Sequence, residues 1–420
     1  MVPYVKICKE RTKMENTKQA YAELVIKEGI NIQKGQRLVI NCPVECADFA
    51  KMCAKAAYEN GCREVIMRWN DDTIARLKYL YADSDVFDKV DPWDEMFSDK
   101  ISEEGAAWLA IYAEDPENLK GVDPDRINRF QVSRGKATAK FREREMRNEF
   151  QWCVCSVPTV AWSKAVFPQL SEDEAVDKLW EEILKACRAD KGDAVSNWRK
   201  HSEELKKHVE ILNGFNFKSL HYTNSLGTDL HVELPEDHFW AGGDEASAKG
   251  VMFSANIPTE EVFTLPKKNG VNGVVYSSRP FCLNGNIIKD FYFVIKDGKI
   301  VEAHAKEGEA ILKDAISVDE GASYFGEVAL VPFDSPISDS GILFLNTLFD
   351  ENASCHIAFG EAYPCIKGAE TMSMEELAER GVNSSMTHED FMVGTRDLSI
   401  IGTTHDGKEI PVFVNGNFAF

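Results

Sequence analysis

Positive charge is in short supply in this sequence. Its 420 residues include 48 lysines and arginines against 69 aspartates and glutamates, which gives a formal net charge of −21 at pH 7. A negative surface of this kind repels the phosphates of nucleic acids, so we expect neither DNA nor RNA as a partner. The charge is compatible with substrates that carry a positive amino group, although many cytosolic proteins are equally acidic.

Long apolar runs and an export signal are also missing. No stretch approaches the roughly 18 uninterrupted apolar residues that a membrane span needs. The first 16 residues, MVPYVKICKERTKMEN, lack the apolar centre of a secretory signal. The 11 cysteines are an odd number and fit reduced thiols in a cytoplasm. We therefore expect a cytoplasmic protein that does not enter a membrane.

Phosphate-binding loops and paired zinc cysteines are absent from the sequence as well. There is no GxGxxG fingerprint and no P-loop, so nothing supports a nucleotide cofactor. Cys42, Cys46, Cys53 and Cys62 do not follow a CxxC spacing. We interpret these four cysteines as small hydrophobic residues of a core.

The hydrophobic pattern changes near residue 215. Before it, apolar strands such as KGQRLVINCPV and CREVIMRW alternate with helices such as ECADFAKMCAKAAYENG, which predicts βαβ units and a mostly parallel sheet. After it, short strands and tight turns take over. Asp297-Gly298 and Asp406-Gly407 each stand between two apolar strands and predict hairpins.

These patterns predict an α/β protein with two domains, the natural expectation for a chain of this length, preceded by a short extension. Residues 1–13 precede a second methionine, Met14, and are expected to be an N-terminal extension. Residues 14–214 are expected to form an α/β domain with a mostly parallel sheet. Residues 215–420 are expected to form a β-rich α+β domain.

The histidines are concentrated in the last segment. Seven of the nine lie after residue 220: His221, His231, His238, His304, His356, His388 and His405. Four stretches there place carboxylates or imidazoles beside apolar strands: NIPTEEVFT, YFGEVALVP, SCHIAFGEAYP and THEDFMVG. Burying such groups is costly unless they are paired or bind a cation.

Together the four stretches supply the donors of a two-metal site. They carry Glu260, Glu261, Glu327, His356, His388 and Asp390. If THEDFMVG is a strand, His388 and Asp390 share one face, because side chains i and i+2 do. One bridging carboxylate and two further ligands per ion would leave positions for water and substrate. The tandem pair Glu260-Glu261 does not itself show which glutamate is a ligand, and a surface pair is the alternative for His388 and Asp390 taken alone.

The same stretches resemble the M29 family of metallo-aminopeptidases, the leucyl aminopeptidase-like aminopeptidase T type. The resemblance is carried, in order, by NIPTEEVFTLP, GEVALVP, HIAFGEAYP and THEDFMVGT. It extends over nearly the whole chain and includes YAELVIKEGINIQKGQRLVINCPVECADFAK, LGTDLHVELPEDHFWAGG and GKEIPVFVNGNFAF. The chain starts earlier than family members usually do, by about the segment before Met14.

The resemblance implies a reaction and a ligand set. It implies a metal-dependent aminopeptidase that releases N-terminal amino acids from short peptides through a two-metal-activated water. The metal ligands implied are Glu261, Glu327, His356, His388 and Asp390, with Glu327 bridging. A homodimer with an enclosed active-site cavity is implied as well.

Two further residues are candidates for catalysis. Tyr363 matches the active-site tyrosine of the family, and its phenol is suited to donate a hydrogen bond to the oxyanion of the tetrahedral intermediate. Glu260 is a candidate general base if the chain bends so that both glutamates reach the cavity; otherwise it is a structural carboxylate. The mixed oxygen and nitrogen donors accept zinc, cobalt, manganese or magnesium.

Other functions fit part of this pattern. Another two-metal hydrolase, such as a dipeptidase or an amidase, has the same ligand set. A non-catalytic protein whose α/β half binds a small molecule is the alternative from a different class. Cys355 beside His356 is a poor nucleophile–base pair, because such partners meet in space and not as sequence neighbours.

Overall fold

The computed structural model describes residues 14–283 and 286–420. The N-terminal extension predicted for residues 1–13 lies outside the described residues. None of the helices in the described part of the chain combines the length and the apolar character that a bilayer crossing requires.

The described chain forms two compact units. The first comprises the described residues up to Glu203 together with Asp244–Pro258, and the second comprises Glu204–Gly243 and Thr259–Phe420. The boundary between the two units lies inside helix α9 (Ala194–Phe215), between Glu203 and Glu204. The hydrophobic pattern gives no sign that Asp244–Pro258 belongs to the first unit, and the domain boundary predicted between residues 214 and 215 stays a prediction.

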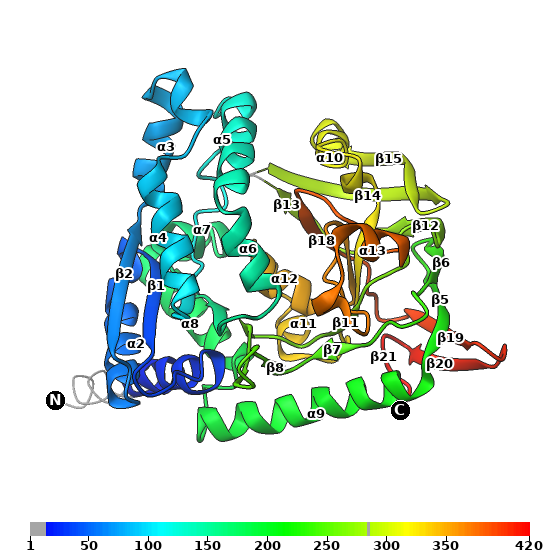
Figure 1. The fold of residues 1–420 in the computed structure, drawn as a ribbon, viewed down its shortest axis with the longest axis horizontal. Coiled ribbons are helices and arrows are strands. Elements are labelled where there is room, and N and C mark those ends of the chain that lie inside the picture. The colour runs from blue at the N-terminus through cyan, green and yellow to red at the C-terminus, as the bar shows by residue number, and fades with distance from the viewer. Residues whose placement is uncertain (1–13, 284–285) are drawn as a thin grey trace. The chain divides into compact units, whose positions relative to one another are not determined.

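The first unit is built on a parallel sheet with the strand order β10-β4-β3-β1-β2, of which Figure 1 labels β1 and β2. All four neighbouring pairs are parallel. The strands are β1 (Arg37–Pro43), β2 (Glu64–Asn70), β3 (Ala107–Ile111), β4 (Trp152–Cys155) and β10 (Asn256–Ile257). Among the helices that connect and follow them are α2 (Ala47–Glu59), α3 (Asp72–Tyr81), α4 (Pro92–Glu103), α5 (Pro124–Ala137), α6 (Ala139–Met146), α7 (Val160–Val166) and α8 (Glu172–Ala186). The predicted α/β class of this half is confirmed.

Strand β1 illustrates why the first half forms a parallel sheet. Leu38, Val39, Ile40 and Cys42 are all buried, so side chains on both faces of the strand are covered. A continuous apolar run of this kind is typical of a parallel sheet with helices on both faces. Cys42 is one of the cysteines interpreted as core residues, and it is buried as expected.

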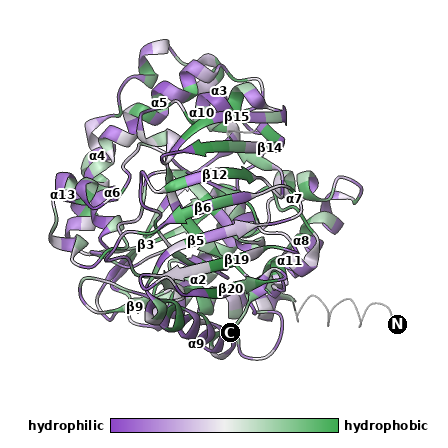
Figure 2. Cartoon of the chain, turned by 90° about the vertical axis from the view of Figure 1, so that its right-hand side faces the viewer, coloured by the Kyte–Doolittle hydropathy of each residue, from purple (hydrophilic) through white to green (hydrophobic). Residues whose placement is uncertain are grey.

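The second unit contains two antiparallel sheets, which confirms its predicted β-rich character. The large sheet has the order β13-β14-β12-β6-β5-β19-β20-β21, with β15 paired to β14, and Figure 2 shows its central strands side by side. Its strands are β5 (Phe217–Thr223), β6 (Asp229–Glu233), β12 (Val271–Tyr276), β13 (Phe281–Leu283), β14 (Asn286–Lys296), β15 (Lys299–Glu307), β19 (Ser399–Thr404), β20 (Glu409–Val414) and β21 (Asn417–Phe418). The small sheet, in the order β18-β17-β16-β11-β7, consists of β7 (Ala241–Gly242), β11 (Val262–Thr264), β16 (Phe325–Leu330), β17 (His356–Gly360) and β18 (His388–Met392).

Both predicted hairpin turns are present in the large sheet. Asp297 and Gly298 connect β14 to β15 with φ values of 50° and 82°, as a type I′ turn requires. Asp406 and Gly407 lie between β19 and β20, which pair antiparallel. Short helices complete the unit: α10 (Glu309–Ala315), α11 (Pro336–Ser340), α12 (Thr347–Asp350) and α13 (Met374–Glu379).

Phenylalanine rings join the two sheets of the second unit. The ring of Phe293 on β14 lies 6.4 Å from that of Phe325 on β16, 6.0 Å from Phe359 on β17 and 5.3 Å from Phe391 on β18. All four side chains are buried in one core, and burying each contributes roughly 1.5–3 kcal/mol. One face of the small sheet therefore packs on the large sheet, and the opposite face is left for other side chains.

A bulge in β16 changes which face its side chains reach. Phe325 pairs with Phe359 and Glu327 pairs with Ala358, so two residues of β16 advance against one residue of β17. In a regular strand, Phe325 and Glu327 would point to the same face. The bulge lets Phe325 enter the core while Glu327 points to the opposite face.

Gly326, inside this bulge, has no room for a side chain. A Cβ there would lie 2.2 Å from the backbone oxygen of Glu361 and 2.6 Å from that of Gly360. We predict that Gly326→Ala lowers the free energy of unfolding by about 1–3 kcal/mol, since the backbone must shift to admit the methyl group. Denaturant unfolding of the purified proteins measures this difference.

The matched control is Gly214→Ala in α9, where an added Cβ meets nothing within 4 Å. Alanine is the better helix former, so this variant should be as stable as the original protein or slightly more stable. Equal stability of Gly326→Ala and the original protein would contradict the role given to the bulge.

Candidate metal centre

The face of the small sheet that points away from the phenylalanine core gathers the predicted ligands. His356 lies on β17, Glu327 on β16, and His388 and Asp390 on β18. Ala358 pairs with both Glu327 and Asp390, so these two carboxylates flank one small side chain. Phe391 of β18 lies in the core, which places His388 and Asp390 together on the other face, as their spacing predicts.

The five side chains converge around His356. Its Nε2 atom lies 2.9 Å from Glu261 Oε2, 3.6 Å from Glu327 Oε1 and 3.9 Å from Asp390 Oδ1. The Nε2 atom of His388 lies 3.5 Å from Asp390 Oδ2 and 3.8 Å from Glu327 Oε2. The structure therefore brings all five predicted ligands together, and the two oxygens of Glu327 face different histidines.

Backbone carbonyl groups orient both imidazole rings. The Nδ1 atom of His388 lies 2.7 Å from the carbonyl oxygen of Glu361, and Nδ1 of His356 lies 3.3 Å from that of Ser354. Because a carbonyl oxygen only accepts, Nδ1 carries the hydrogen and Nε2 is directed at the carboxylates. Histidine ligands of metal ions are usually held in this way.

Two carboxylate oxygens of the cluster face His356 Nε2 without forming a well-aligned hydrogen bond. Within the described residues, Glu261 Oε2 and Asp390 Oδ1 are buried and accept no hydrogen bond of good geometry. Leaving a buried charged oxygen unsatisfied costs more than the roughly 1–3 kcal/mol of a neutral group. A divalent cation would satisfy both atoms, and the mixed oxygen and nitrogen donors fit such an ion.

In the chain without metal, protonated histidines supply part of the positive charge that a cation would bring to the cluster. Burial alone would lower the pKa of His356, but the carboxylates of Glu261 and Glu327 raise it well above its usual range. Burial opposes the same shift in His388, and the charges of Asp390 and Glu327 nevertheless raise its pKa to about 10. Both rings are thus protonated at neutral pH without metal, and a bound metal ion must displace these protons.

The two predicted catalytic residues also lie in the second unit. The ring of Tyr363 lies 5.5 Å from the ring of His388 in an edge-to-face arrangement. Glu260 is buried, and its backbone N–H donates a 2.7 Å hydrogen bond to Asn352 Oδ1. Glu260 and Glu261 both precede β11 and are not part of a regular strand, which would direct them to opposite faces.

Glu351 is a residue that the sequence analysis did not identify. Burial raises the pKa of its carboxyl group well above the usual range, and the charges of Asp390 and Glu261 raise it further. Glu351 and Asp390 line the same pocket, and the side-chain amide of Asn352 donates to Glu351 Oε1 over 3.3 Å. The sequence stretch FDENASC resembles an ordinary polar turn. The only sign of Glu351 in the sequence is its position, five residues before His356.

The neighbouring thiol takes no part as a nucleophile. Burial raises the pKa of Cys355 to about 12, so the thiol is protonated at neutral pH. Its Sγ atom lies 3.4 Å from the backbone oxygen of Val331. This agrees with the expectation that Cys355 and His356 do not form a catalytic pair.

Comparison with known proteins gives the family. Residues 14–418 match the family model Peptidase_M29, described as thermophilic metalloprotease (M29). The chain belongs to the M29 family of metallopeptidases. The resemblance found in the sequence is thereby confirmed, as is the use of a metal that the family description states.

Relatives of the same family match over almost their whole length. Aminopeptidase AmpS of Bacillus subtilis (strain 168) is 45% identical over 401 residues, which cover 95% of this chain and 98% of the relative. Aminopeptidase T of Thermus aquaticus is 39% identical over 401 residues, with 94% and 97% covered. The solved structure of wild-type AmpT from Thermus thermophilus superposes with a TM-score of 0.90 at 36% identity, covering 97% of this chain and all of that one.

Without divalent ions, the thermal stability of the protein should depend on pH through the protonation of the cluster histidines. The pKa of His388 is raised to about 10, so its stabilising contribution is complete below its ordinary pKa of about 6.5 and is lost as the pH rises towards 10. We predict that the melting temperature of the chelator-treated protein falls over this range. The same measurement on His388→Ala should show a smaller fall, and identical pH profiles would contradict the prediction.

Proposed function

We propose that this M29 aminopeptidase hydrolyses the first peptide bond of short peptides at the five-residue cluster around His356, where it holds two divalent cations. The observation that supports the proposal most is the convergence of five side chains, two of whose buried carboxylate oxygens accept no hydrogen bond of good geometry. Glu327 is suited to bridge the ions because its oxygens face different histidines. Zinc, cobalt, manganese and magnesium are all compatible with these donors.

Glu351 would complete the ligand set. Its ionised form is disfavoured by burial and by the neighbouring charges of Asp390 and Glu261. A cation in the cluster would reverse this balance, so Glu351 adds a sixth donor group. When bound, the cations supply Lewis-acid activation of a water molecule and of the scissile carbonyl.

The remaining steps belong to side chains of this chain. The carboxylates of the cluster attract the amino end of a peptide, which selects substrates with a free N-terminus. Tyr363, beside His388, donates a hydrogen bond to the oxyanion that forms at the scissile carbonyl. Glu260, next to Glu261, moves the proton from the attacking water to the leaving amine.

The cellular setting follows from the thiols and the family. The free cysteines of the described chain, of which Cys53, Cys155 and Cys187 are examples, are mostly buried and fit a reducing compartment. We therefore place the enzyme in the cytoplasm. The homodimer implied by the family resemblance is part of the same proposal.

The substrate assignment is tested with a matched pair of peptides, one with a free N-terminus and one acetylated. We predict that the metal-loaded enzyme cleaves only the free peptide and that chelation abolishes cleavage. Glu327→Ala and His388→Ala should each lower kcat/KM by more than about 100-fold, since each removes a metal ligand. His304→Ala, which changes an exposed histidine on β15, is the control and should keep full activity.

Each alternative has its own outcome in this experiment. Equal cleavage of both peptides would favour an amidase or another two-metal hydrolase. Exclusive cleavage of dipeptides would identify a dipeptidase. Metal-loaded protein without any hydrolysis would favour a binding protein and would contradict the proposal.

The role of Tyr363 is tested separately. We predict that Tyr363→Phe lowers kcat by about 100-fold to 1,000-fold with little change in KM, because the lost hydrogen bond forms mainly in the transition state. Tyr81→Phe, at a position that is 78% exposed, is the control. A change confined to KM would show that Tyr363 contacts the substrate without stabilising the oxyanion.

A further inference from the structure

A second group of metal-binding side chains lies on the large sheet, away from the M29 centre. His221 on β5 stands directly opposite His231 on β6 in the antiparallel pair. Their neighbours Leu220, Tyr222 and Leu230 are buried in the core between the two sheets. Because strand side chains alternate, both histidines point to the outer face of the large sheet, and Asp229 does the same.

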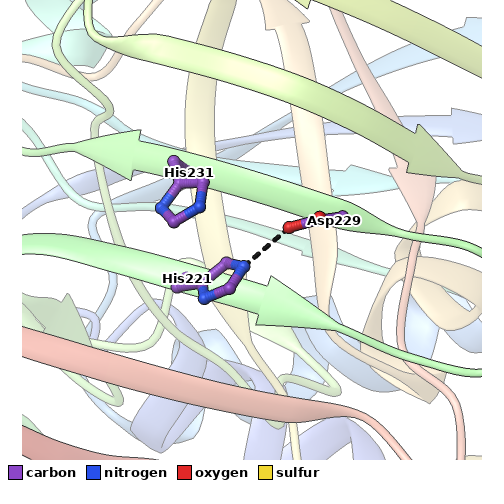
Figure 3. Close-up of side chains that lie close together, drawn as sticks. All are labelled: His221, Asp229 and His231. Atoms are coloured by element: carbon purple, nitrogen blue, oxygen red, sulfur yellow. Dashed lines mark hydrogen bonds and ion pairs between the residues drawn. The ribbon is translucent and has the colours of Figure 1, made fainter.

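The three side chains are close enough to act together (Figure 3). The two imidazole rings are nearly parallel, with an interplanar angle of 12° and centroids 3.8 Å apart. His221 Nε2 lies 2.7 Å from Asp229 Oδ1, its diagonal neighbour on β6. One ligand atom from each of the three residues lies within 4.8 Å of the other two.

The donor types select a class of ion. Two imidazoles and one carboxylate suit zinc, copper or nickel, whereas magnesium and calcium prefer oxygen donors alone. Ligand atoms around a tetrahedral zinc ion are about 3.4 Å apart. His221 Nε2 and Asp229 Oδ1, now 2.7 Å apart, must therefore separate slightly, and the stacked rings must rotate so that both direct a nitrogen at one ion. This movement is available because His221 is 36% exposed and Asp229 is 72% exposed at the side chain.

Asp229 supplies the negative charge of the group. Its Oδ1 atom lies 2.7 Å from His221 Nε2. The hydrogen bond from His221 also lowers the pKa of Asp229, which keeps that carboxylate ionised. A cation there would face one carboxylate and two imidazole nitrogens.

We propose that His221, Asp229 and His231 form a surface site for one divalent transition-metal ion, separate from the catalytic centre. The phenylalanine core lies between the two sites, because the large sheet carries one on its outer face and the small sheet carries the other on its own outer face. The site ties strand β5 to strand β6. Its remaining coordination positions are open to water.

The proposal is tested by titrating chelator-stripped protein with Zn²⁺ alone in a calorimeter at pH 7.5. The original protein, His221→Ala, His231→Ala and the control His304→Ala are compared. His304 is a suitable control because it lies on the same sheet and contacts a carboxylate, Glu302, at 3.0 Å. We expect His221→Ala and His231→Ala to bind one equivalent of zinc fewer than the other two proteins, while their peptide hydrolysis is unchanged.

A catalytic-site variant separates this proposal from the proposed function. Glu327→Ala should keep the equivalent that His231→Ala loses, whether or not the protein proves to be a peptidase. Equal zinc stoichiometry in the original protein and in both histidine variants would overturn the proposal. Loss of one equivalent in His304→Ala as well would also overturn it, because binding would then be general to exposed histidines.

Discussion

Packing between the two sheets of the second unit decides which side chains can reach the metal centre. Phe293 contacts Phe325, Phe359 and Phe391, one ring from each of three neighbouring strands of the small sheet. This contact fixes one face of those strands in the core, and strand geometry then assigns the other face to the polar residues. The predicted ligands are therefore positioned by the core side chains on the opposite face of the same strands.

The cluster itself is a balance of charges in a buried place. Glu261, Glu327 and Asp390 bring negative charge together where water is largely excluded, and in the metal-free chain two protonated imidazoles offset part of it. Such a group is costly to keep without strong counter-charges. The fold supports it through backbone carbonyls that orient His356 and His388.

Much of this arrangement can be predicted from the sequence. The shared face of His388 and Asp390 follows from a period of two, and the parallel sheet follows from apolar runs such as β1. Glu327 is different. Its place beside an apolar run made it a candidate ligand, but strand alternation from the core residue Phe325 would place it in the core, and only the family resemblance implied that it bridges the ions. Glu351 and the return of Asp244–Pro258 to the first unit depend on tertiary contacts that leave no periodic pattern. The pairing of His221 with His231 likewise depends on strand register, which the nine intervening residues do not specify.

The extra residue in β16 shifts the register of this strand against β17. Before Gly326 the odd-numbered Phe325 points to the core, whereas after it the even-numbered Val328 and Leu330 do, and Glu327 points to the opposite face. Inserting one further residue after Gly326, with the bulge kept, would move every later side chain of the strand to the other face. The carboxylate of Glu327 would then enter the layer of phenylalanine rings. Length at this point is consequently constrained as tightly as amino-acid identity, and homologous strands should tolerate substitution beside the bulge more readily than a change in residue count.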